Sequence, residues 1–331
     1  MNQKNYIYWQ YPGFQQAINP ENQLNIKQGN TPLEDHSHLL APAKQSTTKL
    51  FLKREDLNPN GSFKDRALAY QISYLQQQGE KYCVLSSSGN AAISCCAFCQ
   101  KTNIKPIILV SPTIPENKLQ KIITHQPFIL IKTPKARRFA KYLRIKYHFP
   151  ILNPSSDSKA AFGFETLGWE IFNQLPSCHT IFSYSTSGAS IIGIINFYQK
   201  NNLTPPKIVA VKLSDQKNPN FYLHTNNKKI ISIIEKNNGS LITVPANQAQ
   251  AKHLLLQENK INSSIEGAAC LVAIDKYLNK SDQKSNTNPN ENIVCIISGT
   301  EHQISKSISD INIPTAKSLS DIDSIIKQIK H

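Results

Sequence analysis

Short apolar runs alternate along most of the chain with longer stretches whose apolar residues recur at helical spacing. The runs that favour strands are YCVLSS, PIILV, FILIK, TIFSY, KIVAVK, LITV and NIVCIIS. The stretches that favour helices are NAAISCCAFCQK, SPTIPENKLQKII, FETLGWEIFNQL, ASIIGIINFYQK, ANQAQAKHLLLQ, GAACLVAIDKYL and residues 134–147. Strands separated by helices favour parallel sheets with right-handed crossovers. The pattern therefore predicts an α/β protein with two doubly wound parallel-sheet domains.

The two predicted units set the expected domain boundaries. A smaller α/β domain is expected over residues 64–150, and a larger one over residues 29–63 together with residues 151–331. Residues 1–28 have no clear period, so we expect them to form an N-terminal arm.

The balance of charge is strongly basic, with a formal net charge of +15 in 331 residues. Most lysines are scattered, and the one dense cluster, KARRFAKYLRIKYH at residues 135–148, mixes cations with aromatic residues as a nucleic-acid surface can. Its apolar residues fall at helical spacing, so we expect an amphipathic helix with a basic solvent face and no specific nucleic-acid partner. No apolar run reaches the length of a membrane span, and the N-terminus lacks the apolar core of a signal peptide. We therefore expect a cytoplasmic protein with no membrane partner.

The seven cysteines have no spacing typical of a disulfide framework. Cys96 and Cys99 form a C-x-x-C pair, but no second pair of ligands occurs elsewhere in the chain. Small core residues on a closely packed helix are the expected role, and no metal site is predicted.

The segment NPNGSFKDR, residues 58–66, places Lys64 where a helix should begin. Pro59 and Gly61 favour a turn, and Ser62 and Asp65 have the spacing of a capping box, which predicts a helix from about Phe63. A positive charge is disfavoured in the first turn of a helix, so the pKa of Lys64 should fall and its neutral amine should become more available for Schiff-base chemistry. A solvated surface lysine is the alternative that this spacing alone leaves open.

Three predicted strands end in loops rich in serine and glycine. The loops are SSSGN at residues 86–90, STSGAS at residues 185–190 and ISGT at residues 297–300. The first two precede helices, whose N-termini can hold an anion, and the carboxyl ends of parallel strands meet at one edge of a sheet. Together with Lys64, the loops predict one cleft with a lysine, two anion sites and a hydroxyl donor.

The order of several motifs resembles that of the fold-type II pyridoxal-phosphate enzymes, and of threonine synthases most. The motifs are GNTPL (29–33), KREDLNPNGSFKDR (53–66), SSSGNAA (86–92), GFETLGWEI (163–171), STSGAS (185–190), EGAA (266–269) and IISG (296–299). The resemblance extends from about residue 29 to about residue 305. It implies a pyridoxal 5'-phosphate cleft between two α/β domains, a small amino acid as substrate and a homodimer.

The resemblance also implies a role for each matching residue. Lys64 would carry the cofactor and later move the α-proton, Asn90 would contact the cofactor's 3-hydroxyl, and Ser298 would face its pyridine nitrogen. The substrate carboxylate would lie against Ser87, Ser88 and Gly89. The cofactor phosphate would be held by the loop of Ser185, Thr186, Ser187, Gly188, Ala189 and Ser190.

The substrate is the least specified part of this prediction. The activity expected first is that of threonine synthase, which forms threonine from O-phosphohomoserine and water. The arginine that follows Asn-Pro in that family is not evident here, so Arg66 and then Lys159 are the candidates for binding the substrate phosphate. An ion pair of Arg66 with Glu55, Asp56 or Asp65 is the alternative. A threonine or serine dehydratase, a β-replacement enzyme like cysteine synthase, and a basic binding protein on this scaffold stay open as functions.

Overall fold

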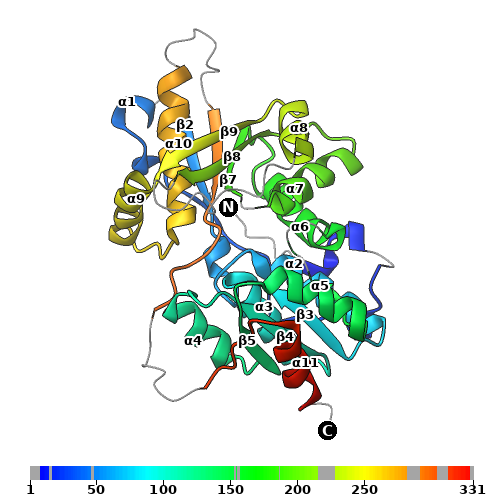
Figure 1. Cartoon of the computed structure of the whole chain (residues 1–331). Coiled ribbons are helices and arrows are strands. Elements are labelled where there is room, and N and C mark those ends of the chain that lie inside the picture. Colours follow the sequence, from blue (N-terminus) through cyan, green and yellow to red (C-terminus); the bar gives the residue numbers. More distant parts are fainter. Residues whose placement is uncertain are drawn as a thin grey trace.

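The computed structural model has two sheets, one in each lobe of the molecule (Figure 1). It describes residues 8–14, 17–45, 48–152, 154, 157–185, 187–214, 228–281, 291–303 and 312–328. The larger sheet has the strand order β1-β2-β10-β7-β8-β9, and the smaller has the order β5-β4-β3-β6. All neighbouring strands are parallel except β1 and β2. This topology confirms the predicted fold class.

The strands and helices have the following bounds. The strands are β1 (Leu33–Asp35), β2 (Thr48–Lys53), β3 (Tyr82–Ser86), β4 (Lys105–Val110), β5 (Ile129–Lys132), β6 (Ile151–Leu152), β7 (Thr180–Tyr184), β8 (Lys207–Ser214), β9 (Ser240–Pro245) and β10 (Glu291–Ile296). The α-helices are α1 (Pro42–Gln45), α2 (Lys64–Gln77), α3 (Asn90–Cys99), α4 (Glu116–Thr124), α5 (Ala136–Tyr147), α6 (Ser158–Gln174), α7 (Ala189–Lys200), α8 (Lys228–Lys236), α9 (Ala246–Glu258), α10 (Ile265–Ser281) and α11 (Leu319–Lys327). Short 3-10 helices are η1 (Tyr8–Gln10), η2 (Pro12–Phe14), η3 (Pro20–Asn22), η4 (Ser37–Leu39) and η5 (Glu55–Leu57).

Each sheet is buried on both faces, which explains why its strands read as nearly continuous apolar runs. In the larger sheet, Phe182 and Val209 belong to the apolar cluster of α9 and α10, whereas Ile181 and Ile208 belong to the cluster of α6, α7 and α8. In the smaller sheet, Val84 packs with α5 and α11, whereas its neighbours in β3 pack with α2 and α3.

Helices α2, α6 and α7 pack closely between the two sheets. A Cβ atom on Gly163 would lie 2.5 Å from the backbone oxygen of Arg66 in α2, and one on Gly193 would lie 2.5 Å from the backbone oxygen of Ala161 in α6. Both helix pairs therefore approach through glycine, and a larger residue at either position would push the two paired helices apart. The helix that carries Lys64 is thus packed closely against α6.

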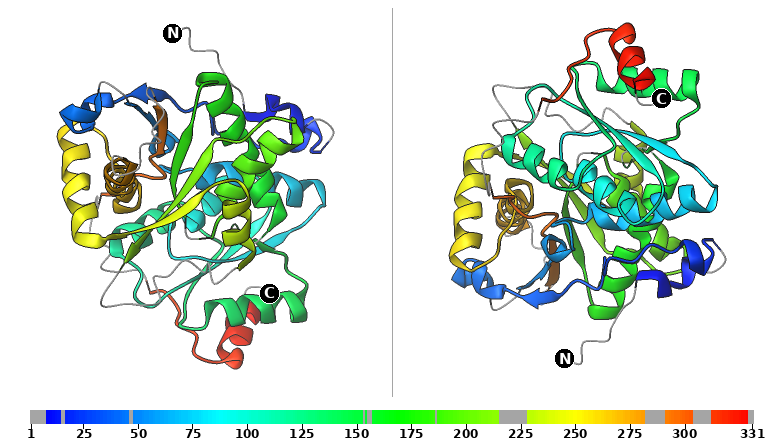
Figure 2. Two further views of the ribbon diagram at one scale, coloured as in Figure 1. Left: turned by 90° about the horizontal axis from the view of Figure 1, so that it is seen from above. Right: turned by 90° about the horizontal axis from the view of Figure 1, so that it is seen from below.

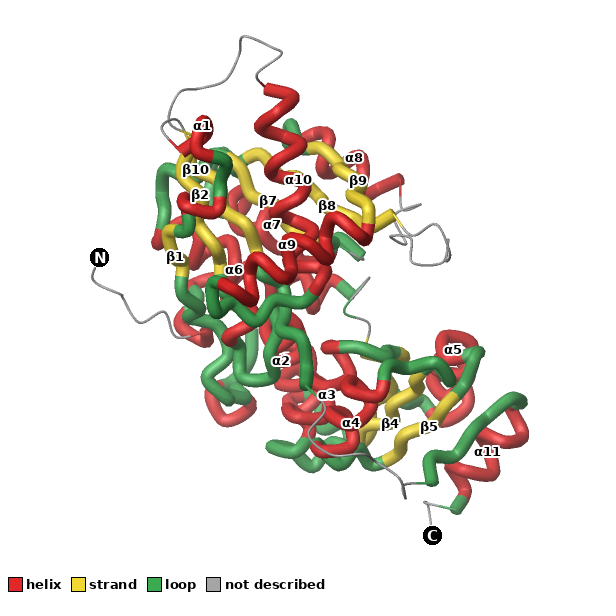
Figure 3. The backbone as a smooth tube through the Cα atoms, turned by 90° about the vertical axis from the view of Figure 1, so that its left-hand side faces the viewer, coloured by secondary structure: helices red, strands yellow, loops and turns green. Residues whose placement is uncertain are grey.

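Both ends of the described chain depart from the predicted domains. Tyr8, Tyr11 and Phe14 are buried in the main apolar cluster, so these side chains of the arm are part of the core. Figure 2 shows the short helical turns of the arm, in dark blue, at the edge of the ribbon. Strand β6 pairs with β3 in the smaller sheet. Helix α11 packs on α5, which Figure 3 shows far from β10. The predicted domain boundary at residue 151 was therefore wrong, and so was the assignment of the C-terminal segment to the larger domain. Both features depend on contacts between segments that lie far apart in the sequence.

The predicted capping box at the start of α2 is also wrong. Helix α2 begins at Lys64, and the Asp65 carboxylate accepts hydrogen bonds from the backbone N and the Nδ2 of Asn60, at 2.8 and 2.9 Å. Asp65 therefore fixes the turn that precedes the helix. Helix α4 begins at Glu116 without a side-chain cap. None of the helices among the described residues combines the length and apolarity that crossing a bilayer requires.

Candidate active site

A cavity of 570 Å³ opens where the carboxyl ends of the strands of both sheets meet. Its wall includes Lys64, the loop after β3, the loop after β10 and Tyr184 at the end of β7. Two of the three loops that we expected in one cleft with Lys64, those after β3 and β10, thus line the same cavity as that lysine. The described residues that line it are Phe63, Lys64, Ser86, Ser87, Gly89, Asn90, Ala91, Pro115, Asn117, Lys118, Pro154, Tyr184, Leu213, Ala246, Ser264, Ile265, Glu266, Ser298, Thr300, Glu301 and His302.

The turn before α2 is tied to the loop after β10, and this contact positions Lys64. Gly61 adopts a φ of 75°, in the left-handed region that glycine tolerates best, and its carbonyl accepts a hydrogen bond from the backbone N of Thr300 at 2.8 Å. The backbone N of Phe63 donates to the carbonyl of Ser298 at 3.1 Å. Lys64 and Ser298, which lie far apart in the sequence, therefore face one cavity from adjoining backbone segments.

The amine of Lys64 lies in an apolar environment. Its Nζ lies 4.9 Å from the centroid of the Phe63 ring and 5.6 Å from that of Phe164. Among the described residues, no carboxylate pairs with it. Burial lowers the pKa of Lys64 to about 8. The predicted direction of the shift agrees with this value, but desolvation rather than the helix dipole is its cause.

This pKa predicts how fast the lysine reacts with an aldehyde. Cofactor-free protein should capture pyridoxal 5'-phosphate at a rate that rises with pH and reaches half its maximum near pH 8, because only the neutral amine attacks the aldehyde. A lysine in an unstructured peptide should need a pH near its ordinary pKa of 10.5. Stopped-flow absorbance across this range measures both profiles. Superimposable profiles would contradict the desolvated environment.

The SSSGN loop presents part of its backbone to the cavity. Ser87, Gly89 and Asn90 line the wall, whereas the Oγ of Ser88 accepts a hydrogen bond from the backbone N of Ser111 at 2.7 Å and lies outside the lining. A Cβ atom added to Gly89 would meet nothing within 4 Å, so a ligand can approach the backbone here at the start of α3.

His302 is a site residue that the sequence prediction missed. Its Nε2 lies 3.2 Å from the Oδ1 of Asn90, and both residues line the cavity. Burial, followed by the charges of Lys121, Lys118 and His125, lowers the pKa of His302 to about 4. The imidazole is therefore neutral at pH 7, and its Nε2–H donates to Asn90, which leaves the Nδ2 donors of Asn90 free to serve a ligand. A single histidine in a polar loop gives no motif by which sequence could find it.

The STSGAS loop stands apart from the cavity wall. The Oγ of Ser185 accepts a hydrogen bond from the backbone N of Gly188 at 2.8 Å, and Gly188 has a φ of 78° directly before α7. Ser185 lines a neighbouring hollow, and Ser187, Gly188, Ala189 and Ser190 are not among the lining residues of the main cavity. Thr186 lies outside the described residues. The phosphate-binding role of this loop stays a prediction.

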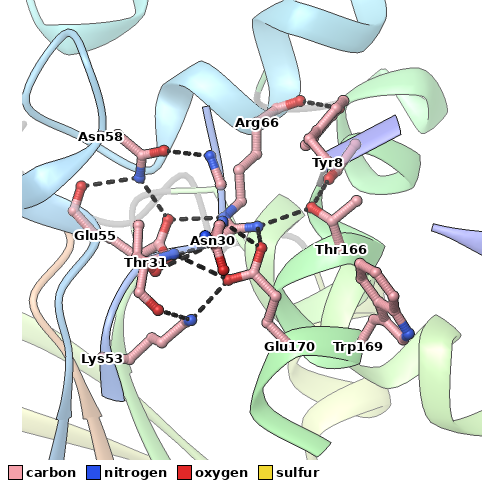
Figure 4. A network of polar contacts seen from close by, with 12 residues as sticks. Tyr8, Asn30, Thr31, Lys53, Glu55, Asn58, Arg66, Thr166, Trp169 and Glu170 are labelled. Carbon is pink, nitrogen blue, oxygen red and sulfur yellow. Dashed lines mark hydrogen bonds and ion pairs between the residues drawn. The ribbon is translucent and has the colours of Figure 1, made fainter. Parts of the chain in front are cut away.

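The expected role of Arg66 in binding a substrate phosphate is wrong, because its guanidinium is fully used inside the protein (Figure 4). Its Nε and Nη2 donate to the two oxygens of Glu55 at 2.8 and 2.7 Å, and its Nη1 and Nη2 donate to the two oxygens of Glu170 at 2.7 and 2.8 Å. The Nζ of Lys53 donates to Glu170 at 2.7 Å, and these side chains have no exposed surface. The alternative pairing with Glu55 is confirmed.

This network accounts for much of the motif resemblance. The backbone N atoms of Asn30 and Thr31, from GNTPL, donate to Glu170, which belongs to GFETLGWEI. The Nδ2 of Asn58 donates to Glu55. KREDLNPNGSFKDR supplies Lys53, Glu55 and Arg66, and therefore both positive and negative charges of the network. Three separated motifs thus meet in a neutral, buried cluster that links β2, α2 and α6.

Lys159 also lies outside the cavity, which makes its predicted role in binding a substrate phosphate wrong. Its Nζ lies 4.5 Å from the centroid of the Tyr74 ring, in a different hollow. Lys118 of α4 lines the cavity instead, and Glu266 and Glu301 line it too. The sequence prediction missed Lys118 because nothing in SPTIPENKLQKII separates it from the other lysines.

The cysteines are free thiols. Cys96 and Cys99 are buried on α3 as predicted, and the Sγ of Cys99 lies 3.9 Å from the Sγ of Cys83. The Sγ atoms of Cys83, Cys95 and Cys99 all lie within 4.8 Å of one another inside the apolar core.

Known proteins resemble the chain in sequence over most of its length. The pattern of the family described as pyridoxal-phosphate dependent enzyme matches residues 24–299. The threonine synthase of Bacillus sp. (strain ULM1) is 34% identical over 96 residues, which cover 29% of this chain and 25% of that protein. The L-threonine dehydratase of Staphylococcus epidermidis (strain ATCC 12228) is 24% identical over 305 residues, which cover 83% of this chain and 71% of that protein. The match thus spans only a quarter of that threonine synthase.

Solved structures share the fold. Maize serine racemase superposes with a TM-score of 0.71 and 18% identity, covering 94% of this chain and 96% of that one. The processed form of threonine deaminase isoform 2 from Solanum lycopersicum superposes with a TM-score of 0.67 and 22% identity, covering 83% and 80%.

Proposed function

We propose, from the premise that the chain belongs to the family of pyridoxal-phosphate dependent enzymes, that it eliminates the β-hydroxyl of a small amino acid such as serine or threonine. The overall products would be a 2-keto acid and ammonia. Because the chain belongs to this family, it is an enzyme and its cofactor is pyridoxal 5'-phosphate.

The cavity fits this cofactor in the chemistry of its donors. Lys64 offers an amine with no acidic partner among the described residues, and Asn90 offers amide donors that His302 orients. Ser298 also lines the cavity, where its hydroxyl would serve a ring nitrogen. The open space at Gly89 would be filled by any side chain, so glycine leaves room there for a bound group.

The bound cofactor would withdraw electrons from the substrate and stabilise negative charge at its Cα. Residues of the chain would bind the substrate carboxylate and transfer the protons. The backbone beside Gly89, at the N-terminus of α3, would hold the substrate carboxylate. The Nζ of Lys64, with a pKa of about 8, would take the proton from Cα and return a proton to the departing hydroxyl.

The charges around the cavity indicate which leaving group the site can accept. A phosphate dianion needs about two positive charges at its site. Among the described lining residues there is no arginine, His302 is neutral, and Lys118 is offset by Glu266 and Glu301. A neutral hydroxyl has no such need, which favours the dehydratase over threonine synthase. Lys118 and the partial match to threonine synthases keep that activity as the second candidate.

A substrate screen tests this proposal. Purified holoenzyme should release pyruvate from serine or 2-oxobutanoate from threonine, measured by coupled reduction of the keto acid. It should release phosphate from O-phosphohomoserine at least about tenfold more slowly, a difference of about 1.4 kcal/mol in transition-state stabilisation. Phosphate release with formation of threonine as the fastest reaction would replace the proposal by the second candidate. Acetate release from O-acetylserine as the fastest reaction would indicate β-replacement, and no reaction with any of them would favour a binding role.

A further inference from the structure

We propose that a second hollow, on the smaller lobe and behind the active site, binds a free amino acid with an apolar side chain. This groove has a volume of 770 Å³ and lies where the C-terminal part of α2, the end of α5 and the start of α6 meet. The catalytic cavity and this groove share no lining residue.

Gln71 provides the first observation that points to a ligand. It is 1% exposed and lines the groove, and its Nε2 donates to the Oδ2 of Asp157 at 2.8 Å. A carboxylate only accepts hydrogen bonds, so this contact fixes the orientation of the amide. The Oε1 of Gln71 is then left buried without a donor. An orphaned buried acceptor is costly, and a ligand ammonium would satisfy it.

The charges of the groove match the two ends of an amino acid. Asp157 lies beside the orphaned oxygen and would add an ion pair to the ammonium. Arg144, Lys159 and His148 also line the groove, together with Glu80. Among the described residues, neither Arg144 nor Lys159 pairs with a carboxylate, so both cations are available for a ligand carboxylate.

The floor of the groove selects the side chain. It is formed by Leu75, Phe149 and Leu152, which are buried, and Tyr74 closes one side. An aliphatic or aromatic side chain would gain free energy by covering these surfaces, whereas a charged one would lose hydration. The groove thus combines a polar pair for the backbone of the ligand with an apolar floor for its side chain.

The groove adjoins the catalytic cavity through one short segment. Leu152 and Asp157 line the groove, while Pro154, between them in sequence, lines the cavity. A ligand that holds Asp157 is therefore placed to influence the wall of the active site.

Titration calorimetry on borohydride-reduced holoenzyme tests the proposal, because reduction blocks the reaction of an amino acid at the cofactor. At least one of valine, leucine, isoleucine and phenylalanine should bind with one site per chain. Isocaproate and isoamylamine, which each lack one charged end of leucine, should bind at least about tenfold more weakly. Isocaproate that binds as tightly as the best amino acid, or no binding by any of the four, would overturn the proposal.

Two variants locate the site. Gln71→Leu and Arg144→Ala should each weaken binding at least about tenfold, whereas Lys141→Ala, on the outer side of the same helix as Arg144, should leave it unchanged. Arg144 is exposed, so its variant should fold even if Gln71→Leu does not. Unchanged binding in Arg144→Ala and in folded Gln71→Leu would place the ligand elsewhere and refute this site.

Discussion

Replacing Lys64 by alanine should lower kcat by at least about a thousandfold, because the variant loses the amine that carries the cofactor and moves the α-proton. Purified Lys64→Ala protein should also lack the absorbance of a covalently bound cofactor. The fold should survive, since the side chain faces the cavity and makes only ring contacts at 4.9 and 5.6 Å. Steady-state kinetics with serine and threonine, together with circular dichroism, measure both parts.

Lys118→Ala is the matched control for this variant. Lys118 is the other lysine among the described residues of the cavity wall, so a general loss of positive charge would act in both variants. The control should keep its colour and most of its turnover of serine or threonine. Loss of turnover in Lys118→Ala with activity retained in Lys64→Ala would reverse the assignment of roles.

Replacing Arg66 by leucine should destabilise the protein by about 3–5 kcal/mol, because it leaves the buried Glu55 carboxylate without a cation and leaves Lys53 as the one cation at Glu170 among the described residues. The guanidinium serves both carboxylates with two hydrogen bonds each, and Lys53 cannot replace it at Glu55. Denaturant unfolding of the holoenzyme followed by fluorescence measures the loss.

A partly exposed ion pair provides the control. Lys252 pairs with Asp275 at 2.7 Å, and their side chains are 23% and 39% exposed. Lys252→Ala should therefore cost no more than about 1 kcal/mol. If Arg66→Leu unfolds at the same denaturant concentration as Lys252→Ala and changes KM for one substrate alone, Arg66 acts on substrate and the buried network is not its main role.

The parallel character of the sheets and the position of Lys64 at the start of a helix could be predicted from the sequence because local pattern decides them. Strands buried on both faces are continuous apolar runs, and loops at their carboxyl ends meet at one edge of the sheet. SSSGN and ISGT follow such strands, so their meeting with Lys64 follows from topology.

The remaining features depend on contacts between distant residues. Whether Arg66 reaches a substrate or the core depends on the approach of α6, which brings Glu170 to it across 104 residues of sequence. Strand β6 has two residues and no period to detect. His302 becomes part of the site only through its contact with Asn90, 212 residues away. Such pairings leave no local signal in one sequence.

The most direct test of the central claim is to reduce the holoenzyme with borohydride, digest it and identify the modified peptide by mass spectrometry. The account predicts pyridoxyl phosphate on Lys64 and on no other residue, because Lys64 is the lysine in the cavity with a lowered pKa and no acidic partner among the described residues. Stoichiometric modification of Lys118 or of a lysine outside the cavity, with Lys64 unmodified, would contradict it.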